Sequence, residues 1–158
     1  MLLPSIFRSL EEDYWHLCES VQVWDVSVQR QVEITGPDTQ KLVQLMTPRD
    51  LSQAELGQCF YAPLCDETGG MINDPILIKH SNNHWWLSIA DSDVLLWAKG
   101  LATGFGLDAL VTEPDIWPLA VQGPKAEELL SRIFGKEISK ILFFRSSTFN
   151  YQGTKMLV

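Results

Sequence analysis

Apolar residues recur at helical spacing between residues 9 and 21. The apolar positions of this stretch are Leu10, Tyr14, Leu17 and Val21. Such spacing puts them on one face of an α-helix. Ser9 precedes the first of them and Glu12 follows three residues after Ser9, which is the arrangement of a capping box. The pattern predicts a capped amphipathic helix near the start of the chain.

Alternating apolar and polar residues replace this pattern at 23–28 and again at 31–35. Alternation is the period of a half-buried strand. Gly36-Pro37 then ends the second stretch, and residues 39–46 return to helical spacing before Thr47-Pro48. We therefore expect two strands, a tight corner and a short amphipathic helix.

The segment from residue 57 to residue 90 has the periodicity of strands throughout. Residues 59–65 and 71–79 are predicted strands joined by a turn at 67–70. Pro75 interrupts the second, because proline has no N–H to donate to a sheet. Ser81-Asn82-Asn83 predicts a tight hairpin that leads to a strand at 84–90.

The rest of the chain predicts further helices and strands. The expected elements are a helix at 94–102 that starts near Asp91-Ser92-Asp93, strands at 107–113 and 117–122, a helix at 125–134, and a strand pair formed by 141–144 and 148–158.

One local pattern occurs twice in the chain. Residues 32–37 (VEITGP) form a predicted strand that ends in Gly-Pro and precedes a helix, and residues 119–124 (LAVQGP) do the same. Two such βα units separated by strands are what a ferredoxin-like sheet requires. We therefore predict the α+β class, with a ferredoxin-like split βαβ antiparallel sheet and its helices.

Composition and charge narrow the possible partners. The chain has 158 residues, the length of one domain, and its 20 acidic against 12 basic residues give a formal net charge of -8. This balance disfavours nucleic acid and anionic membranes, whose phosphates need clustered Lys and Arg. No stretch has the length of a membrane span or the layout of a signal peptide. Three cysteines without a CxxC motif favour free thiols, so we expect a cytoplasmic protein.

Few residues suggest metal or nucleophile chemistry. His80 and His84 flank a predicted turn with Asp91 nearby, but no third ligand has convincing spacing, so we predict no metal site. Cys59 and Cys65 share one predicted strand, and buried structural thiols are the simpler interpretation. We assign no catalytic residue from these patterns.

Two other features allow a functional or a structural interpretation. Trp85 and Trp86 must point to opposite faces of their strand, so they either pack in the core or offer a stacking surface. Tyr61, Asn73 and Asp74 lie in predicted neighbouring strands that are otherwise apolar. Polar residues there are costly to bury unless they are paired. They lie either at the solvated edge of the sheet or around a ligand.

Several motifs resemble those of one enzyme family, the glycine-cleavage T-proteins (aminomethyltransferases). They appear in the family's order, over nearly the whole chain: WDVS at 24–27 with QVEITGPD at 31–38, TGGMIND at 68–74, and LAVQGP at 119–124. The resemblance implies the first part of the folate-binding T-protein fold. It also implies tetrahydrofolate as cofactor and one-carbon transfer as activity.

The resemblance suggests roles for the polar residues of the hairpin. Tyr61, Asn73 and Asp74 would contact the folate. Asn73 stands where aminomethyltransferases have an acidic residue that supports catalysis. An amide cannot act as a general base, so aminomethyl transfer in glycine cleavage is the weaker alternative.

Other stretches resemble the dimethylsulfoniopropionate demethylase branch of this family. They are YWHL at 14–17, KLVQLMT at 41–47, NDP at 73–75, WWLSIADSDV at 85–94 and AKGLA at 98–102. The branch moves a methyl group from a sulfonium, an activated leaving group, to tetrahydrofolate. Positioning can then carry much of the catalysis, and a neutral Asn73 is tolerable. An aromatic face such as Trp24 or Trp85 would attract the sulfonium.

The length of the chain qualifies these expectations. Residues 1–158 resemble only the N-terminal folate-binding domain of the family, with an incomplete middle domain and no C-terminal barrel. Val158 ends an apolar stretch without a polar tail, so we expect a part of a longer protein. Whether it is active alone stays open, and a non-catalytic folate-binding or interaction domain is the alternative. We also expect self-association through apolar surface that the missing domains would cover.

Overall fold

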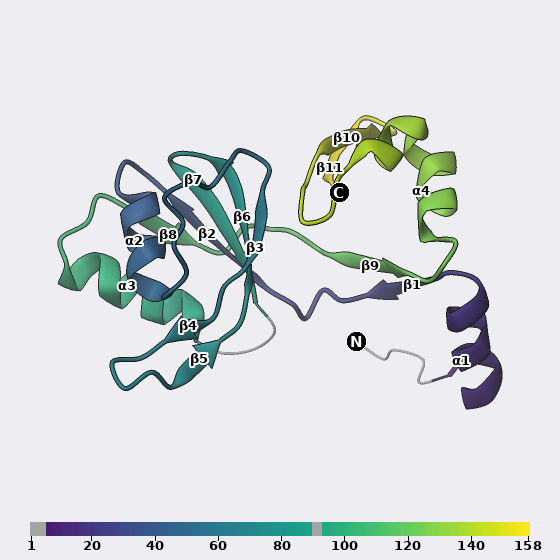
Figure 1. Ribbon diagram of the computed structural model, residues 1–158, viewed down its shortest axis with the longest axis horizontal. Helices are drawn as coiled ribbons and strands as arrows, with labels where there is room; N and C mark the ends of the chain where they lie inside the picture. The colour runs from purple at the N-terminus through teal and green to yellow at the C-terminus, as the bar shows by residue number, and fades with distance from the viewer. Residues whose placement is uncertain (1–5, 90–92) are drawn as a thin grey trace. The chain divides into compact units, whose positions relative to one another are not determined.

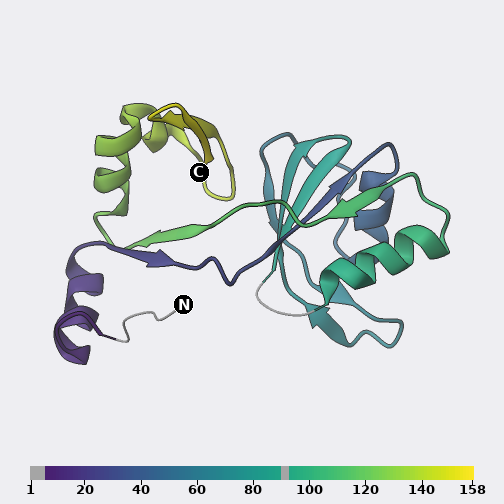
Figure 2. The same cartoon turned by 180° about the vertical axis from the view of Figure 1, so that it is seen from behind.

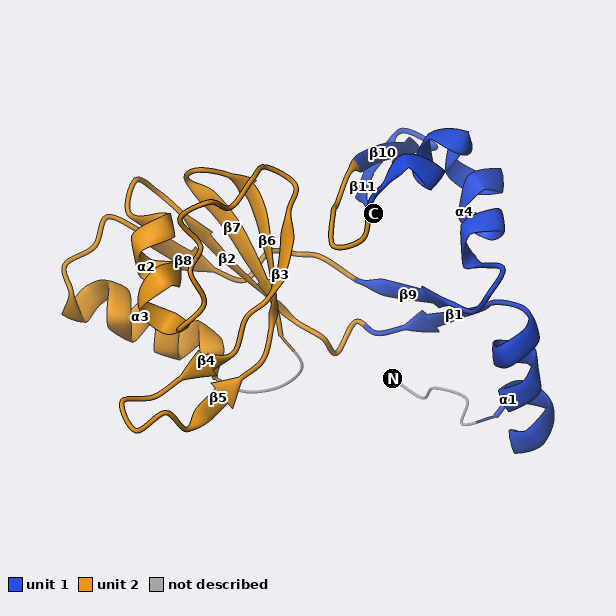
Figure 3. Ribbon diagram, viewed as in Figure 1, with its two compact units in different colours: residues 1–26, 118–142, 148–158 blue, residues 27–117, 143–147 orange. Residues whose placement is uncertain are grey.

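The computed structural model describes residues 6–89 and 93–158. This part of the chain divides into two compact units (Figure 3). Unit 1 comprises residues up to 26 together with 118–142 and 148–158, and unit 2 comprises 27–117 and 143–147. None of the described helices is long and apolar enough to cross a membrane.

Unit 2 contains an antiparallel sheet of five strands in the order β3-β6-β7-β2-β8. Its elements in chain order are β2 (Gln31–Thr35), α2 (Thr39–Met46), β3 (Cys59–Tyr61), β4 (Leu64–Cys65), β5 (Met71–Asn73), β6 (Ile76–Ser81), β7 (His84–Ser88), α3 (Val94–Gly104) and β8 (Leu110–Thr112). Strands β4 and β5 pair separately. Helices α2 and α3 cover one face of the large sheet (Figures 1 and 2).

The core of unit 2 lies between that face and the two helices. Apolar side chains that alternate along the strands form one layer of the core, and the apolar side chains on one face of α2 form the other. The completely buried larger side chains include Trp85, Ile34, Leu42, Met46, Leu51, Leu64, Leu77 and Leu87. Each contributes about 1.5–3 kcal/mol of apolar burial, which makes this layer the main stabilising contact of the unit.

The sheet confirms the α+β class and its ferredoxin-like order. When the edge strand β3 and the β4–β5 pair are left out, the remaining elements follow one another as β2-α2-β6-β7-α3-β8. This is a βαββαβ chain, and its strands lie in the order β6-β7-β2-β8. The predicted second βα unit forms, as strand β9 (Leu119–Gln122) followed by α4 (Ala126–Phe134), but it does not belong to this sheet. The strand that precedes the second crossover is β7, followed by α3, whereas β9 belongs to unit 1. β7 follows β6 through a tight hairpin, and such local pairing has a low entropic cost of closure.

Unit 1 holds the remaining helices and strands. They are α1 (Leu10–Glu19), β1 (Gln22–Asp25), β9, α4 (Ala126–Phe134), the 3₁₀ helix η1 (Lys136–Lys140), β10 (Thr148–Tyr151) and β11 (Thr154–Leu157). The predicted cap of α1 is confirmed: the Ser9 hydroxyl accepts from the Glu12 amide at 3.1 Å and lies 3.2 Å from the Glu12 carboxylate. Strand β1 pairs with β9 and β10 pairs with β11.

The predicted strand at 141–144 is wrong. Phe144 has a φ of 55°, outside the extended region, so the backbone cannot continue as a strand there. The C-terminal pair lies instead within 148–157, around a turn at Gln152-Gly153 where both residues have positive φ. That is the geometry of a two-residue hairpin turn.

The repeated Gly-Pro pattern forms the same corner in both units. Gly36 has a φ of 121° and Gly123 a φ of 125°. The amide two residues after each glycine donates to a carbonyl of a neighbouring segment, that of Asp108 at 3.1 Å and that of Ser20 at 3.0 Å. A Cβ on either glycine would lie 2.6 or 2.4 Å from the same carbonyl oxygen. Each corner therefore requires glycine for two reasons: the positive φ and the lack of space for a Cβ.

Candidate functional site

The predicted polar residues gather where the edge strand β3 meets the segment between β5 and β6. The Tyr61 hydroxyl donates to Oδ2 of Asp74 at 3.1 Å. Both residues are exposed, with 45% of Tyr61 accessible, whereas Asn73 is buried with 7% accessible. The structure thus brings Tyr61 and Asp74 together and turns the neighbouring Asn73 into the protein.

The predicted strand pairing in this region needs correction. Residues 59–65 do not form one strand, because β3 ends at Tyr61 and β4 begins at Leu64. Pro63 stands in the gap and has no N–H for a ladder. Tyr61 therefore lies opposite Ile76, and Asn73 opposite Leu64. The predicted interruption at Pro75 is confirmed, since β5 ends at Asn73 and β6 begins at Ile76.

A carboxylate that the sequence patterns did not single out holds the adjoining turn. Oδ1 of Asp66 accepts from the Thr68 amide at 2.9 Å, the Thr68 hydroxyl at 2.8 Å and the Gly70 amide at 2.8 Å. These hydrogen bonds, the Thr68 hydroxyl first, lower the pKa of Asp66. An aspartate two residues before a Thr-Gly-Gly turn is the sequence signal that could have identified this role.

The electrostatics of the Tyr61–Asp74 pair keep the phenol protonated. The hydrogen bond to Asp74 and the negative charge of that carboxylate raise the pKa of Tyr61 above its ordinary value of 10.0. Tyr61 is therefore a neutral donor near pH 7 and Asp74 its acceptor. A ligand at this edge would meet an aromatic ring and an oriented acidic group.

A basic residue contacts the backbone of Tyr61 from the loop after α2. Nη1 of Arg49 donates to the backbone oxygen of Tyr61 at 2.8 Å. Its guanidinium carbon lies 5.3 Å from the centroid of the Phe60 ring. Sequence reasoning missed Arg49, because its position after Thr47-Pro48 only indicated the end of a helix.

A second polar cluster lies on the face of the sheet opposite α2 and α3. The Glu33 carboxylate accepts from Trp86 Nε1 at 3.0 Å and Thr112 Oγ1 at 3.1 Å, and lies 2.8 Å from Nε2 of His84. Burial raises the pKa of Glu33, but these hydrogen bonds outweigh it, and the net pKa lies below 4.5. The cluster ties β2 to both neighbouring strands.

His80, His84 and Trp86 belong to this arrangement. The His80 ring lies 4.7 Å from that of His84, and burial, followed by the charge of His84, lowers the pKa of His80. Among residues 6–89 and 93–158, no three His, Cys, Asp or Glu side chains gather as a metal ion needs. Asp91 lies outside the described residues.

Trp85 and Trp86 do point to opposite faces, Trp85 being fully buried in the core.

The cysteines do not share a strand as predicted. Cys59 lies in β3 and Cys65 in β4, and all three cysteines are free thiols. Burial raises the pKa of Cys59, against smaller opposing effects of Ser146 and Arg145. A thiol with a raised pKa is a poor nucleophile at neutral pH, in keeping with a structural role.

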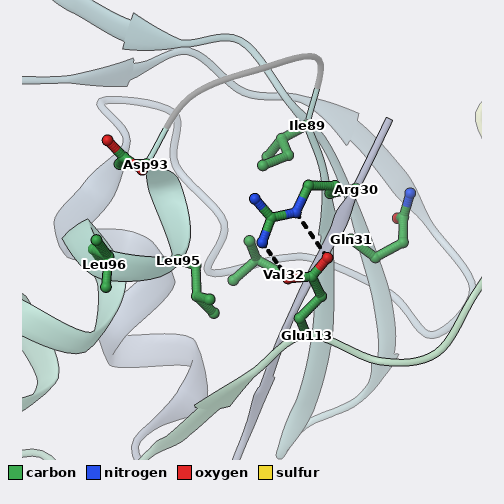
Figure 4. A pocket seen from close by; sticks show the side chains of 8 residues that line it. All are labelled: Arg30, Gln31, Val32, Ile89, Asp93, Leu95, Leu96 and Glu113. Atoms are coloured by element: carbon green, nitrogen blue, oxygen red, sulfur yellow. Dashed lines mark hydrogen bonds and ion pairs between the residues drawn. The ribbon is translucent and has the colours of Figure 1, made fainter. Parts of the chain in front are cut away.

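A separate cavity of about 210 Å³ lies beside β2, lined by Arg30, Gln31, Val32, Ile89, Asp93, Leu95, Leu96 and Glu113. Figure 4 shows the Arg30 guanidinium turned toward the Glu113 carboxylate. Nε of Arg30 donates to Oε1 of Glu113 at 2.7 Å, and its Nη2 contacts the other oxygen. The charge of Arg30 is therefore matched within the protein.

Comparison with known proteins identifies the family. A family model described as the GCVT N-terminal domain matches residues 2–158. The chain belongs to this family. It is 48% identical over all 158 residues to the dimethylsulfoniopropionate demethylase DmdA of Ruegeria pomeroyi, of which it covers 43%. It is 28% identical over 145 residues to an aminomethyltransferase of Alkaliphilus metalliredigens, covering 90% of this chain and 39% of that protein.

A solved structure of the family has the same fold. It is the glycine cleavage system aminomethyltransferase T from Bartonella henselae, with a TM-score of 0.78 over 85% of this chain and 37% of that one, at 22% sequence identity. The chain thus spans about two fifths of the length of these relatives. The family predicted from the motifs is confirmed.

Proposed function

We propose that residues 1–158 form the N-terminal folate-binding part of a tetrahydrofolate-dependent methyltransferase that demethylates dimethylsulfoniopropionate. The observation that carries this proposal is the 48% identity to DmdA along the whole chain. The aminomethyltransferases match less closely, at 28–30% identity.

The residues at the edge of β3 fit a folate. Tyr61 offers an exposed ring for a planar ligand, and its hydroxyl holds the Asp74 carboxylate in one orientation at 3.1 Å. A carboxylate accepts hydrogen bonds from amino-pyrimidine N–H groups, which a reduced pterin carries. We propose that Tyr61, Asn73 and Asp74 hold tetrahydrofolate. When bound, tetrahydrofolate would supply the nitrogen that accepts the methyl group, while the sulfonium sulfur keeps the electron pair of the broken carbon–sulfur bond and the N–H proton of that nitrogen passes to solvent.

The side-chain amide of Asn73 favours methyl transfer from a sulfonium over aminomethyl transfer. Asn73 is buried with 7% accessibility and its side chain is neutral. An amide cannot accept a proton at neutral pH, so Asn73 would position groups rather than act as a base. Trp85 is fully buried, so it offers no ring face for attraction of the sulfonium.

Calorimetric titration of the 158-residue chain with tetrahydrofolate tests the proposal. We expect saturable binding that Tyr61→Phe and Asn73→Ala both weaken. Tyr61→Phe removes only the hydroxyl that contacts Asp74. Tyr151→Phe, a change at an exposed tyrosine in β10 of unit 1, is the matched control and should bind like the parent chain.

The outcomes separate the alternatives. No saturable binding would refute the folate assignment. Where binding is found, proton NMR of the chain with tetrahydrofolate and dimethylsulfoniopropionate follows the sulfonium methyl signal. Loss of that signal supports methyl transfer, whereas folate binding without loss supports the non-catalytic folate-binding alternative for this chain.

We further propose that unit 1 mediates self-association. Its helices α1 and α4 bury no residue, and its exposed apolar side chains include Phe7, Leu10, Tyr14, Trp15, Val23, Trp24, Leu119 and Ile133. Apolar surface of this extent favours association. A monomer by light scattering at high concentration would contradict it.

A cytoplasmic location is also proposed, since the three cysteines are free.

A further inference from the structure

Arg49 is held in a fixed position although its side chain is exposed. Its guanidinium donates to the Tyr61 carbonyl at 2.8 Å and lies over the Phe60 ring. Its backbone is fixed as well, because Gln44 donates to the Arg49 carbonyl at 2.8 Å and the Arg49 amide donates to the Thr47 hydroxyl at 3.3 Å. Much of the entropy that an arginine loses on binding a ligand is therefore already lost.

The ion pairing of Arg49 differs from that of the other arginines of unit 2. Arg30 pairs with Glu113, and Arg145 pairs with Glu55 at 2.6 Å. Arg49 forms no ion pair with any residue in the described part of the chain. In a protein of formal charge -8, an ordered cation without an acidic partner provides a local site for an anion.

The remaining hydrogen-bonding capacity of Arg49 specifies the kind of anion. A guanidinium has five N–H donors in a planar fork, and the Tyr61 carbonyl takes one of them. Such a fork matches the two oxygens of a carboxylate. We propose that Arg49 binds a carboxylate group of the ligand at the Tyr61–Asp74 site. This inference rests on the proposed function, since both proposed ligands carry carboxylates: tetrahydrofolate on its glutamyl tail and dimethylsulfoniopropionate on its propionate.

A purely structural role for Arg49 makes a different prediction. If the guanidinium only fixes the end of β3, its removal weakens every ligand of the site alike, because the Tyr61 backbone shifts. If it binds a carboxylate, removal weakens only the ligand whose carboxylate it contacts. The two roles are therefore separated by ligands that differ in that group alone.

The experiment compares three ligands by calorimetry on the 158-residue chain: tetrahydrofolate, tetrahydropteroate, which lacks the glutamyl tail, and dimethylsulfoniopropionate. We expect Arg49→Gln to weaken one carboxylate-bearing ligand roughly 10- to 100-fold, the size of a charge-assisted hydrogen bond, and to leave tetrahydropteroate unchanged. A loss for tetrahydrofolate assigns the glutamyl tail, and a loss for dimethylsulfoniopropionate alone assigns the propionate. Arg145→Gln, the same change at an ion-paired arginine of unit 2, should alter none of them.

Arg49→Lys keeps the positive charge without the fork and should recover part of the lost affinity. It also serves as the test variant if Arg49→Gln does not fold. Equal weakening of all three ligands, or no weakening of any, overturns the inference while the folate proposal stands. If the unaltered chain does not bind tetrahydrofolate, the proposed function itself fails and this inference fails with it.

Discussion

Replacing Gly36 by alanine should destabilise unit 2 severely, although it adds a single methyl group. The new Cβ would lie 2.6 Å from the Asp108 carbonyl oxygen and 3.2 Å from the Ala109 Cα, both backbone atoms that cannot rotate away. The φ of 121° is in addition a conformation that alanine avoids. Backbone strain of about 1–3 kcal/mol and overpacking of about 1–3 kcal/mol add to roughly 2–6 kcal/mol.

That loss is large against the stability of a small domain. For a unit of this size, 1 kcal/mol corresponds to roughly 4–8 °C in Tm, so we expect Gly36→Ala to lower Tm by about 8–48 °C. Far-UV circular dichroism during heating measures the shift, and urea unfolding gives the free energy independently.

Gly100→Ala is the matched control within the same unit. Gly100 lies inside α3, and a Cβ there meets nothing within 4 Å. Alanine is favoured over glycine in a helix by about 0.5–1 kcal/mol, so this variant should be slightly more stable. If Gly36→Ala melts within about 2 °C of the parent, the close approach of the corner to Asp108 is not a feature of the folded protein.

Further expectations concern titration, thiol reactivity and the core. The lowered pKa of Glu33 means that its hydrogen bonds stabilise the fold above pH 4.5 and that this contribution is lost as pH falls through the pKa of the folded state. Glu33→Gln should therefore reduce the pH dependence of the free energy of urea unfolding in that acidic range. The lowered pKa of His80 means that the unfolded chain takes up the proton first, so stability should fall as pH drops below 6.5, and His80→Gln should reduce that slope. Iodoacetamide should alkylate exposed Cys18 well before Cys59, with the two rates converging in urea, as read by mass spectrometry; equal rates in buffer would argue against burial of Cys59. Lys79→Ala, which removes a buried side chain and its 2.8 Å hydrogen bond to a backbone carbonyl, should cost about 2–4 kcal/mol in chemical denaturation, and a change below about 0.5 kcal/mol would show that this contact is dispensable.

Several features of this protein are determined by its sequence within a few residues. The Ser9–Glu12 cap, the α2 helix at Thr39–Met46 and the interruption at Pro75 follow from local spacing and backbone chemistry, and the structure has each of them. The family was also recognisable from short motifs. Such features depend on contacts within one or two turns of chain, so pattern alone specifies them.

Only the tertiary structure decided which strands meet and which side chains share a site. Two Gly-Pro corners looked alike in sequence, yet only the one at Gly36 belongs to the five-stranded sheet. The hydrogen bonds of Glu33 join residues 51 to 79 positions apart, and Arg49 reaches the carbonyl of Tyr61 twelve residues away. Such partners are selected by strand order and register, which depend on the balance of core burial and loop closure over the whole unit. The local spacing of apolar residues does not predict that balance.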